Sequence, residues 1–346
     1  MKPKSLINSK LFVFSLFISV FMFNSCSKEE FSGLSERQVL NEIVNFDSQE
    51  DFSTTLEKVV GMSSEELKAY EASKGYKSFG RTCEEFYRGI DFDDFTSLEE
   101  LKAFIEKNSE YLTLVEDEEG ELVLETVLSR SPYRYFVNND KLFRIKDEVY
   151  KVFGDGVIST NVSNIEVLKE MNSTSVTGLD VDEQIRVMAS YRASKFSENQ
   201  LKDAVYNCGR HAEARKTNKR DRTKIEISID YLDTYDINNV PMTIYENRVL
   251  IRPYKRTLGV WYWCSRTLSC DIKVAIDHKT ASGWQRGFYY KSESGKHTSK
   301  LEYIMSGGVV SIGSWQRYDM HYGGYDCWAD SPSTSHVHLE CNTSLF

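Results

Sequence analysis

The most constraining feature of this 346-residue sequence is a change in the spacing of its apolar residues. From Lys224 onward apolar and polar residues alternate, as in the run from Ile225 to Tyr231, and Gly, Ser and Asn separate further short runs up to the C-terminus. Alternation places every second side chain on one face, which is typical of a strand buried on one side. The pattern predicts an all-β domain at 225–346, an antiparallel sandwich or barrel.

The part of the chain before Lys224 shows helical spacing and legible helix starts. A Ser or Thr followed three residues later by Glu or Gln, as at Ser63 and Glu66, recurs ahead of apolar positions and indicates helix N-termini. Runs with a period of two interrupt these helices at 122–124, 133–137, 142–145 and 149–153. We therefore expect a small antiparallel meander among helices, an α+β domain at 27–207.

Charge divides the chain in the same place. The net charge is -9, but residues 27–207 hold 21 Lys and Arg against 37 Asp and Glu, while residues 208–346 hold 19 against 15. An acidic front part and a mildly basic back part should attract one another across an interface. The basic excess of the back part is too small to indicate a nucleic-acid partner.

The N-terminus has the layout of an export signal. Three lysines precede an apolar stretch from Leu11 to Phe23, which is short for a membrane span, and Cys26 follows. This segment resembles the lipobox signals of Bacteroidota lipoproteins, and Ser27-Lys28-Glu29-Glu30 resembles the acidic signal that directs such lipoproteins to the outer cell surface. The resemblance implies a signal peptide at 1–26, a lipid on Cys26 and an anchor in the outer membrane. The alternative is a plain secretory signal with an incidental cysteine.

Six further cysteines remain in a compartment that permits disulfides. They are Cys83, Cys208, Cys264, Cys270, Cys327 and Cys341. Six cysteines allow fifteen connectivities. Proximity in sequence favours Cys264 with Cys270 and Cys327 with Cys341, which leaves Cys83 with Cys208. Buried free thiols are the alternative. A zinc site is disfavoured because no CxxC pair exists.

A basic run at 208–224 separates the two predicted domains. Its cleavage candidates are Arg210, Arg215, Lys216, Lys219, Arg220 and Arg222. We expect an exposed polar linker, which is a preferred site for an Arg-specific or trypsin-like protease. The alternative is a solvated C-terminal end of the preceding helix. A Cys208–Cys83 bond would let a cut free the back part, whereas a bond from Cys208 to a C-terminal cysteine would keep the pieces joined.

The back part is rich in aromatic residues that suit recognition. The candidate contacts with a ligand or a membrane are Trp261, Trp263, Trp315, Tyr318 and Trp328. Trp and Tyr stack on sugar rings or lie at a bilayer interface, although core packing would account for at least half of such residues. His336 and His338 flank Val337 and are weak candidates for a metal site, without a recognised metalloprotease motif. No cofactor is expected.

An acidic lipid-anchored front part, a basic hinge and an aromatic, cysteine-rich β back part resemble the layout of proteolytically activated antibacterial lipoprotein toxins of gut Bacteroidota. This bacteriocin-like resemblance implies that the front part restrains or delivers the back part until a protease cuts between them. Residues 133–138 and 147–153 also resemble uncharacterised Bacteroidota lipoprotein domains, which implies no activity. We expect a non-enzymatic antibacterial effector. An uncleaved glycan-binding or adhesive lipoprotein with an envelope receptor comes second, and a metal-dependent hydrolase third.

Overall fold

The structure is a computed structural model that describes residues 43–117, 119–171, 175–176, 179, 184–189, 208–235, 240–280, 283–312 and 320–346. The predicted signal peptide and Cys26 lie outside this set. No helix within the described residues has the length and apolar character needed to cross a membrane.

The front part begins with helices whose starts follow the sequence signals. They are α2 (Gln49–Val60), α3 (Ser64–Lys74), α4 (Phe79–Arg88) and α5 (Leu98–Lys107), with the short α6 (Ile165–Glu170) further along. A serine side chain accepts a backbone N–H at the start of each of the first four. The predicted capping box at Ser63 and Glu66 is confirmed, with both reciprocal hydrogen bonds present.

The predicted meander is part of a five-stranded sheet, which we call sheet A. Its strands are β1 (Asn45–Phe46), β4 (Leu142–Ile145), β5 (Glu148–Phe153), β6 (Gly156–Asn161) and β7 (Arg186–Ala189), in that order across the sheet. The prediction of a strand at 133–137 is wrong, because Pro132–Tyr135 form a 3-10 helix instead. Pro132 presets the helical φ at its start, and Ser131 caps it by accepting from the Tyr133 N–H.

A second sheet, sheet B, contains strands from both predicted domains. From the front come β2 (Leu112–Glu116) and β3 (Leu122–Thr126), and from the back β8 (His211–Asn218), β9 (Asp221–Tyr235), β10 (Pro241–Thr257), β11 (Val260–Trp263) and β14 (Leu301–Ile312). β11 pairs with β3 in parallel, with Trp261 opposite Val123 and Tyr262 opposite Leu124. The two parts therefore share backbone hydrogen bonds, and residues 41–346 form one compact unit.

The expectation of an exposed polar linker at 208–224 is also wrong. β8 and the start of β9 form an antiparallel hairpin across this segment, with Asn218 opposite Asp221. Small residues on one face of the hairpin, such as Ala212 and Ala214, pack against the core of the back part. The basic residues are thereby held in a strand pair, neither in a free linker nor in a helix end.

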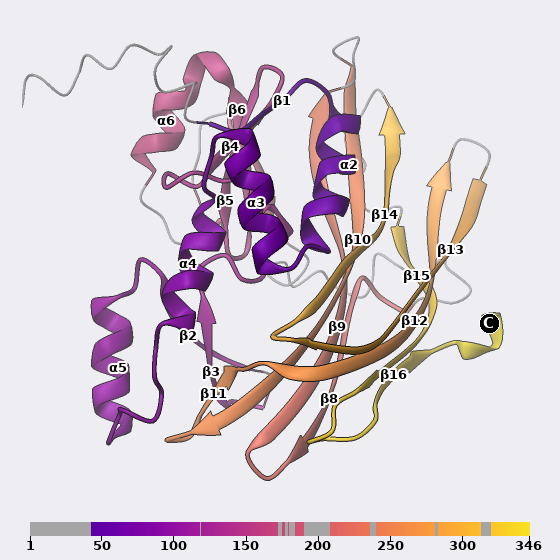
Figure 1. Ribbon diagram of the computed structural model, residues 1–346. Helices are drawn as coiled ribbons and strands as arrows, with labels where there is room; N and C mark the ends of the chain where they lie inside the picture. Colours follow the sequence, from indigo (N-terminus) through magenta and orange to yellow (C-terminus); the bar gives the residue numbers. More distant parts are fainter. Residues whose placement is uncertain are drawn as a thin grey trace, which may run out of the picture. The chain divides into compact units, whose positions relative to one another are not determined.

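The third sheet, sheet C, is antiparallel throughout and runs in the order β13 (Gly283–Thr298), β12 (Arg266–Thr280), β15 (Met320–Asp330) and β16 (Val337–Cys341). Apolar side chains from sheet C and from β9, β10 and β14 fill one core, which includes Ile227, Val249, Ile272, Val274 and Cys327. A mostly β back part with two facing sheets agrees with the alternation in its sequence. Figure 1 shows these strands bending alongside one another.

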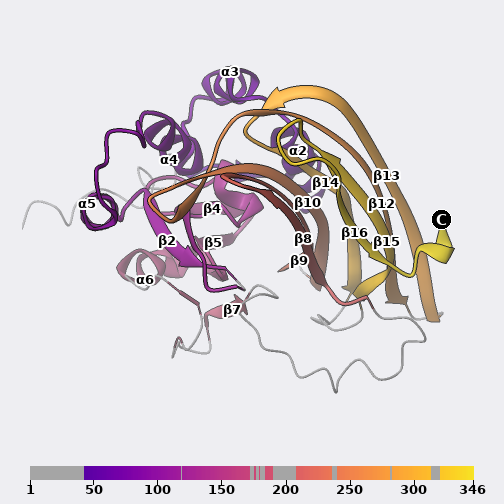
Figure 2. The ribbon, with the colours of Figure 1, turned by 90° about the horizontal axis from the view of Figure 1, so that it is seen from below.

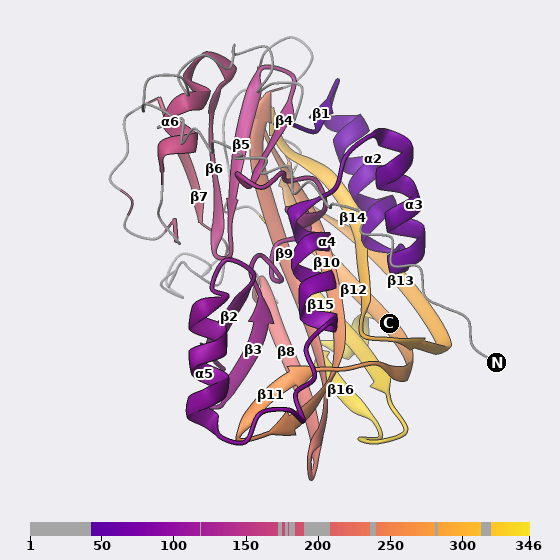
Figure 3. The ribbon, with the colours of Figure 1, turned by 60° about the vertical axis from the view of Figure 1, so that its left-hand side comes forward.

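The opposite face of sheet B packs on the front part. Leu232, Met242, Ile244 and Ile304 join a core with residues of α2, of the 3-10 helix and of sheet A. Figure 2 shows β9 and β10 between sheet A and sheet C. Figure 3 shows sheet A near one end of these long strands and β2, β3 and β11 near the other. The long strands β9, β10 and β14 therefore have their two faces in different cores. This corrects the expectation of a strand buried on one side at 225–231, because both the even and the odd positions of 225–229 are buried.

Buried ion pairs join the front and back parts of the chain. Glu302 of β14 accepts hydrogen bonds from Arg134 Nη1 at 3.1 Å and from Arg248 Nε at 2.7 Å. At the other end of sheet B, Asp117 accepts from Arg215 Nη1 at 2.6 Å and from Arg222 Nη1 at 3.0 Å. Ion pairs of the expected sign thus join Asp117 of the acidic front part to the basic hairpin. Loss of one partner from a buried pair would leave the other charge uncompensated in a desolvated setting.

Candidate functional site

The tryptophans of β11 are core residues, which corrects their assignment as ligand contacts. Trp261 and Trp263 are 1% and 5% exposed. The Trp263 ring stacks on Tyr87 of α4 with centroids 3.9 Å apart, and Trp261 Nε1 donates to Glu121 at 3.1 Å. Tyr87 thus covers the Trp263 ring, and the Arg222 guanidinium lies over the Trp261 ring at 4.0 Å from its centroid, so ring faces that a sugar would need are already occupied. Trp315 and Tyr318 lie outside the described residues.

Trp328 lies on the outer face of sheet C, the face turned away from the core of the back part. Its indole ring is parallel to the His338 ring, with centroids 3.5 Å apart and an angle of 9° between the planes. Trp328 Nε1 donates to Asp326 Oδ1 at 2.9 Å, and His338 Nε2 lies 2.9 Å from the same oxygen. Burial raises the pKa of Asp326, but the hydrogen bonds from His338 and Trp328 outweigh it and lower that pKa. Asp326 therefore holds both rings in place as a carboxylate.

The two histidines do not converge on one point. His336 is 71% exposed and pairs through Nδ1 with Asp330, while His338 pairs with Asp326. Among the described residues, the group of three side chains close enough to share a metal ion is His211, Glu213 and Glu226, whose candidate ligand atoms lie within 4.8 Å of one another. An ammonium group, Lys224 Nζ, contacts both of these carboxylates, so a protein cation already occupies the place that a metal ion would take between them.

The largest exposed apolar side chains of the described residues gather on β13, the edge strand of sheet C. Trp284, Phe288 and Tyr290 are 46%, 45% and 63% exposed. They alternate with Tyr289, which packs on the core, so all three lie on the outer face. Phe346 at the C-terminus adds a fourth ring, with its centroid 6.1 Å from that of Phe288 and 6.4 Å from that of Tyr290. We call Trp284, Phe288, Tyr290 and Phe346 the aromatic face.

The aromatic face continues into the polar cluster around Trp328. The cross-strand register places Tyr290, Lys273 and Asp326 in one row across β13, β12 and β15. Lys273 Nζ lies 3.5 Å from Asp326 Oδ2. Sequence reasoning missed the three rings of β13: the predicted strand at 287–290 included Phe288 and Tyr290 but not Trp284, and the even spacing of 284, 288 and 290 is the signal that could have grouped them. Which face of β13 is exposed to solvent depends on sheet B, which covers the opposite face of sheet C.

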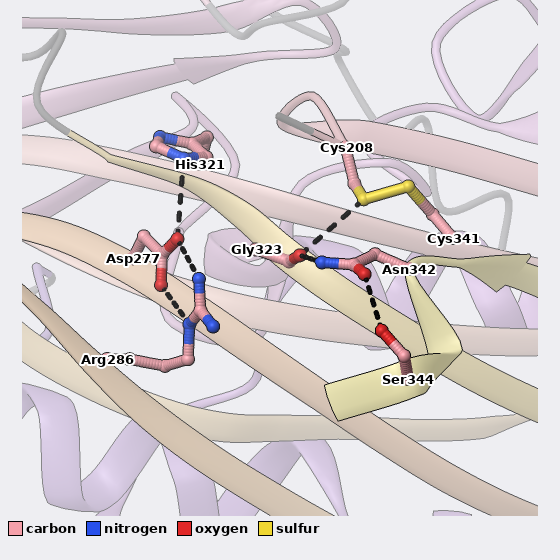
Figure 4. Close-up of a disulfide and its surroundings, with 8 residues drawn as sticks. All are labelled: Cys208, Asp277, Arg286, His321, Gly323, Cys341, Asn342 and Ser344. Atoms are coloured by element: carbon pink, nitrogen blue, oxygen red, sulfur yellow. Dashed lines mark hydrogen bonds and ion pairs between the residues drawn. A yellow bond between two sulfur atoms is a disulfide. The ribbon is translucent and has the colours of Figure 1, made fainter. Parts of the chain in front are cut away.

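A second polar row lies at the Trp284 end of this surface. Figure 4 shows Asp277 between Arg286 and His321. Arg286 donates from Nε and Nη2 to the two Asp277 oxygens at 2.5 and 2.6 Å, and His321 Nε2 lies 3.6 Å from Oδ2. His321 is 1% exposed, and the Trp284 ring packs edge-on against it at 4.9 Å between centroids. The exposed ring thus rests on a fixed ion pair and a buried imidazole.

The disulfide is Cys208–Cys341, which corrects the pairing expected from proximity in sequence (Figure 4). Cys208 N–H donates to Tyr322 O and Tyr322 N–H donates to Gly209 O, so residues 208–209 run beside β15. β16 pairs with the same strand, with Cys341 opposite Tyr325. The two cysteines meet because both segments lie along β15. Cys83, Cys264, Cys270 and Cys327 are free thiols, and burial raises the pKa of Cys83 and of Cys327 to about 12.

The cleavage candidates divide into buried and exposed residues. Arg210 is 2% exposed and donates from Nε to Met320 O at 2.7 Å, and Arg222 is 4% exposed. Arg215 is held by Asp117. Exposed positions begin at Lys216 and include the tip of the β8–β9 hairpin, Lys219 and Arg220. A protease would therefore reach the tip of the hairpin before any other part of 208–224.

Comparisons with known proteins leave the family open. No protein-family model matches this chain, and no curated protein is similar to it. Among solved structures, a DUF4848 family protein from Bacteroides thetaiotaomicron aligns over 87% of this chain and 97% of its own, with 12% sequence identity and a TM-score of 0.27.

Proposed function

We propose that this chain is a non-enzymatic, lipid-anchored protein of the outer cell surface that binds glycan chains through the outer face of sheet C. The observation that carries the proposal is the aromatic face, where Trp284, Phe288 and Tyr290 leave 46%, 45% and 63% of their surface in contact with solvent. Exposed rings gathered on one face mark an interaction site, whereas apolar residues scattered singly over a surface need no explanation.

The chemistry of the face suits sugars. An aromatic ring offers a flat apolar surface to the C–H face of a pyranose, and Tyr and Trp add a polar edge. Six residues of strand separate Trp284 from Tyr290, roughly 20 Å, which is long enough for several sugar units. Lys273, Asp326 and His338 lie beside the rings and offer hydrogen bonds to hydroxyl groups.

The polar groups on the outer face of sheet C favour ligand binding over catalysis. The Asp277 carboxylate is held by Arg286, and the Asp326 carboxylate by His338 and Trp328. Each is thereby engaged as a hydrogen-bond acceptor that positions a ring or a cation. A general base would instead need an accessible group aimed at a substrate proton.

Affinity electrophoresis of the full chain tests the proposal, in native gels containing amylopectin, α-mannan, arabinoxylan or mucin glycans. We expect at least one polysaccharide to retard the protein, with Trp284→Ala and Tyr290→Ala each weakening retardation about tenfold. Ser294→Ala, an exposed position on the same strand, should behave as the wild type. Retardation by none of the four, or equal retardation of all variants, would overturn the proposal.

A membrane surface is the competing ligand for exposed rings beside Lys and Arg. Sedimentation with vesicles of phosphatidylcholine and phosphatidylglycerol distinguishes it. Co-sedimentation that requires Trp284 and Tyr290, with no retardation by any polysaccharide, would replace the glycan proposal with membrane binding. Absence of co-sedimentation together with retardation supports the glycan proposal.

An antibacterial effector activated by cleavage is the second candidate. The exposed tip at Lys219 and Arg220 favours it, because exposed loop tips with basic residues are the positions that an Arg-specific protease can reach. Growth inhibition of neighbouring strains by the cut protein, and its loss in a Lys219→Gln, Arg220→Gln double variant that stays uncut, would support this function. Equal inhibition by cut and uncut protein would remove it.

A further inference from the structure

A cavity of about 530 Å³ lies in the front part of the molecule, beside β2, β3 and the turn that follows β3. Its volume is within the range of small-molecule sites, which is roughly 300–1,000 Å³. None of its lining residues belongs to the aromatic face. We propose that this cavity binds a small amphipathic anion, a molecule with a carboxylate or sulfonate head on a hydrocarbon body.

The walls of the cavity are largely apolar. Leu112, Leu128 and Phe153 form its inner wall and are almost fully buried, while the partly buried Val115 and Val127 leave apolar surface accessible. A hydrocarbon body placed against these side chains would leave water, which favours binding in proportion to the apolar area buried.

Two cations at the cavity have no carboxylate within ion-pair distance, and the ammonium of one of them, Lys141, lies 5.7 Å from the centroid of the Phe79 ring. Arg130 lies in the turn after β3, and Lys141 directly precedes β4. Within the described part of the chain, no carboxylate oxygen lies within 4.0 Å of the charged nitrogens of either residue, although ion pairs occur at many other positions. An anionic head group would supply the missing partner, and a cation paired in a partly desolvated site binds more strongly than one at an open surface.

The two acidic residues of the lining are already engaged. Glu125 accepts from Arg252 Nη1 at 2.8 Å and from Ser129 Oγ at 2.7 Å. Burial raises the pKa of Glu125, but Arg252 and Arg130 outweigh it and lower that pKa, so Glu125 stays ionised with Arg252 as its close partner. Asp155 accepts from Val176 N–H at 2.9 Å and from the Ser175 hydroxyl. Arg252 therefore balances Glu125, while these two donors to Asp155 are neutral. Arg130 and Lys141 together exceed the single charge of Asp155, so the net charge that faces a ligand is positive.

The backbone at the cavity is held in an unfavourable conformation. Leu128 has a φ of 64° and Lys141 a φ of 65°, both in the left-handed region that side chains other than glycine rarely adopt. Arg248 fixes the first turn by donating to the carbonyl oxygens of Ser129 and Arg130. Such strain is kept where the surrounding structure imposes it, and it occurs most often at binding sites. It places both cations in position before a ligand arrives.

Binding of 8-anilinonaphthalene-1-sulfonate to the full chain tests the proposal, because this probe has an aromatic body, a sulfonate head and a fluorescence that rises in apolar sites. We expect saturable binding of one probe per chain. Decanoate should displace it at least tenfold better than decanol, which has the same body without the charge. Lys141→Gln and Arg130→Gln should each raise the dissociation constant of the probe about fivefold, as expected for loss of one partly buried charged contact.

Lys146→Gln is the matched control. Lys146 directly follows β4, whereas Lys141 directly precedes that strand. Lys146 also has a backbone in the left-handed region, with a φ of 52°. This variant should bind the probe as the wild type does. Equal displacement by decanol, or an equal effect of Lys146→Gln and Lys141→Gln, would overturn the proposal.

Trp284→Ala separates this site from the aromatic face. Probe binding that survives this substitution, and that still requires Lys141, supports the cavity as the site. Loss of the probe signal in Trp284→Ala would place the probe on sheet C and overturn the inference without touching the glycan proposal.

Discussion

Cys208 and Cys341 are joined by a disulfide that spans 133 residues of sequence and brings their Cα atoms to 6.0 Å. Cys208 precedes the β8–β9 hairpin, whereas Cys341 ends β16, so the bond links the chain on either side of the basic segment. A cut at the hairpin tip would thus leave two covalently joined pieces. If cleavage activates this protein, release of the back part also requires reduction.

The first prediction concerns this bond. A recognition site for a specific protease inserted between Lys219 and Arg220 should allow cleavage at the exposed tip. After cleavage, denaturing electrophoresis should show one band without reductant and two bands with it. The Cys208→Ser, Cys341→Ser double variant should give two bands in both lanes. Two bands from the disulfide-intact chain without reductant would contradict the observed pairing.

The second prediction concerns the buried charges between front and back. Glu302 has Arg134 and Arg248 as partners, and its neutralisation would leave both guanidinium groups short of compensation in a buried setting. Glu302→Gln should lower the free energy of unfolding by about 3–5 kcal/mol. Urea unfolding measures this value. Glu57→Gln on the exposed face of α2 should stay within about 0.5 kcal/mol of the wild type, and a similar result for Glu302→Gln would contradict the prediction.

The third prediction is a loss of stability in acid that depends on Glu84. Burial raises the pKa of Glu84, but Lys300 and Arg134 outweigh it and hold the pKa at about 2, below its usual 4.5. Because the unfolded chain binds this proton more readily, the contribution of Glu84 is present above pH 4.5 and is lost as the pH falls towards 2. Its size is on the order of 3 kcal/mol.

Urea unfolding of wild type and Glu84→Gln at a series of pH values between 6 and 2.5 measures this contribution. The variant should be less stable at pH 6 and should lose less on acidification, so the two curves should converge. Parallel curves would show that Glu84 does not carry the effect.

The fourth prediction concerns a close approach at Gly80 in α4. A Cβ at this position would lie 2.5 Å from the Arg134 carbonyl oxygen, a backbone atom that cannot rotate away. Gly80→Ala should therefore destabilise the protein by about 1–3 kcal/mol, although Ala in place of Gly normally favours a helix. Gly154→Ala, with no heavy atom within 4 Å of the added Cβ, is the matched control. Thermal unfolding compares the two, and equal midpoints would contradict the close approach.

Local features of this protein were predictable because they depend on neighbours in sequence. The capping box at Ser63 is made by residues three positions apart, and the meander at 142–153 needs only short turns. Alternation from Lys224 onward likewise predicted a mostly β back part, but the expectation of one buried face per strand was wrong for β9 and β10, whose two faces are both buried. These patterns report which face of an element is buried. They do not report what buries it.

Pairing between distant segments was decided by the tertiary structure. Trp261 is buried because β11 lies against β3, about 140 residues earlier in the chain, and Cys208 meets Cys341 because both segments lie along β15. The basic run forms a hairpin because its alternate small residues fit the back core and its cations meet Asp117.

The candidate site shows the same division. The sequence by itself determined that Phe288 and Tyr290 share one face of a strand, since alternation is a local property, and the structure extends that strand back to Gly283 so that Trp284 joins them. Only the packing of sheet C on sheet B decided that this face is exposed while Tyr289 is turned inward. Burial is a property of partners, and the partners of these strands come from distant parts of the chain.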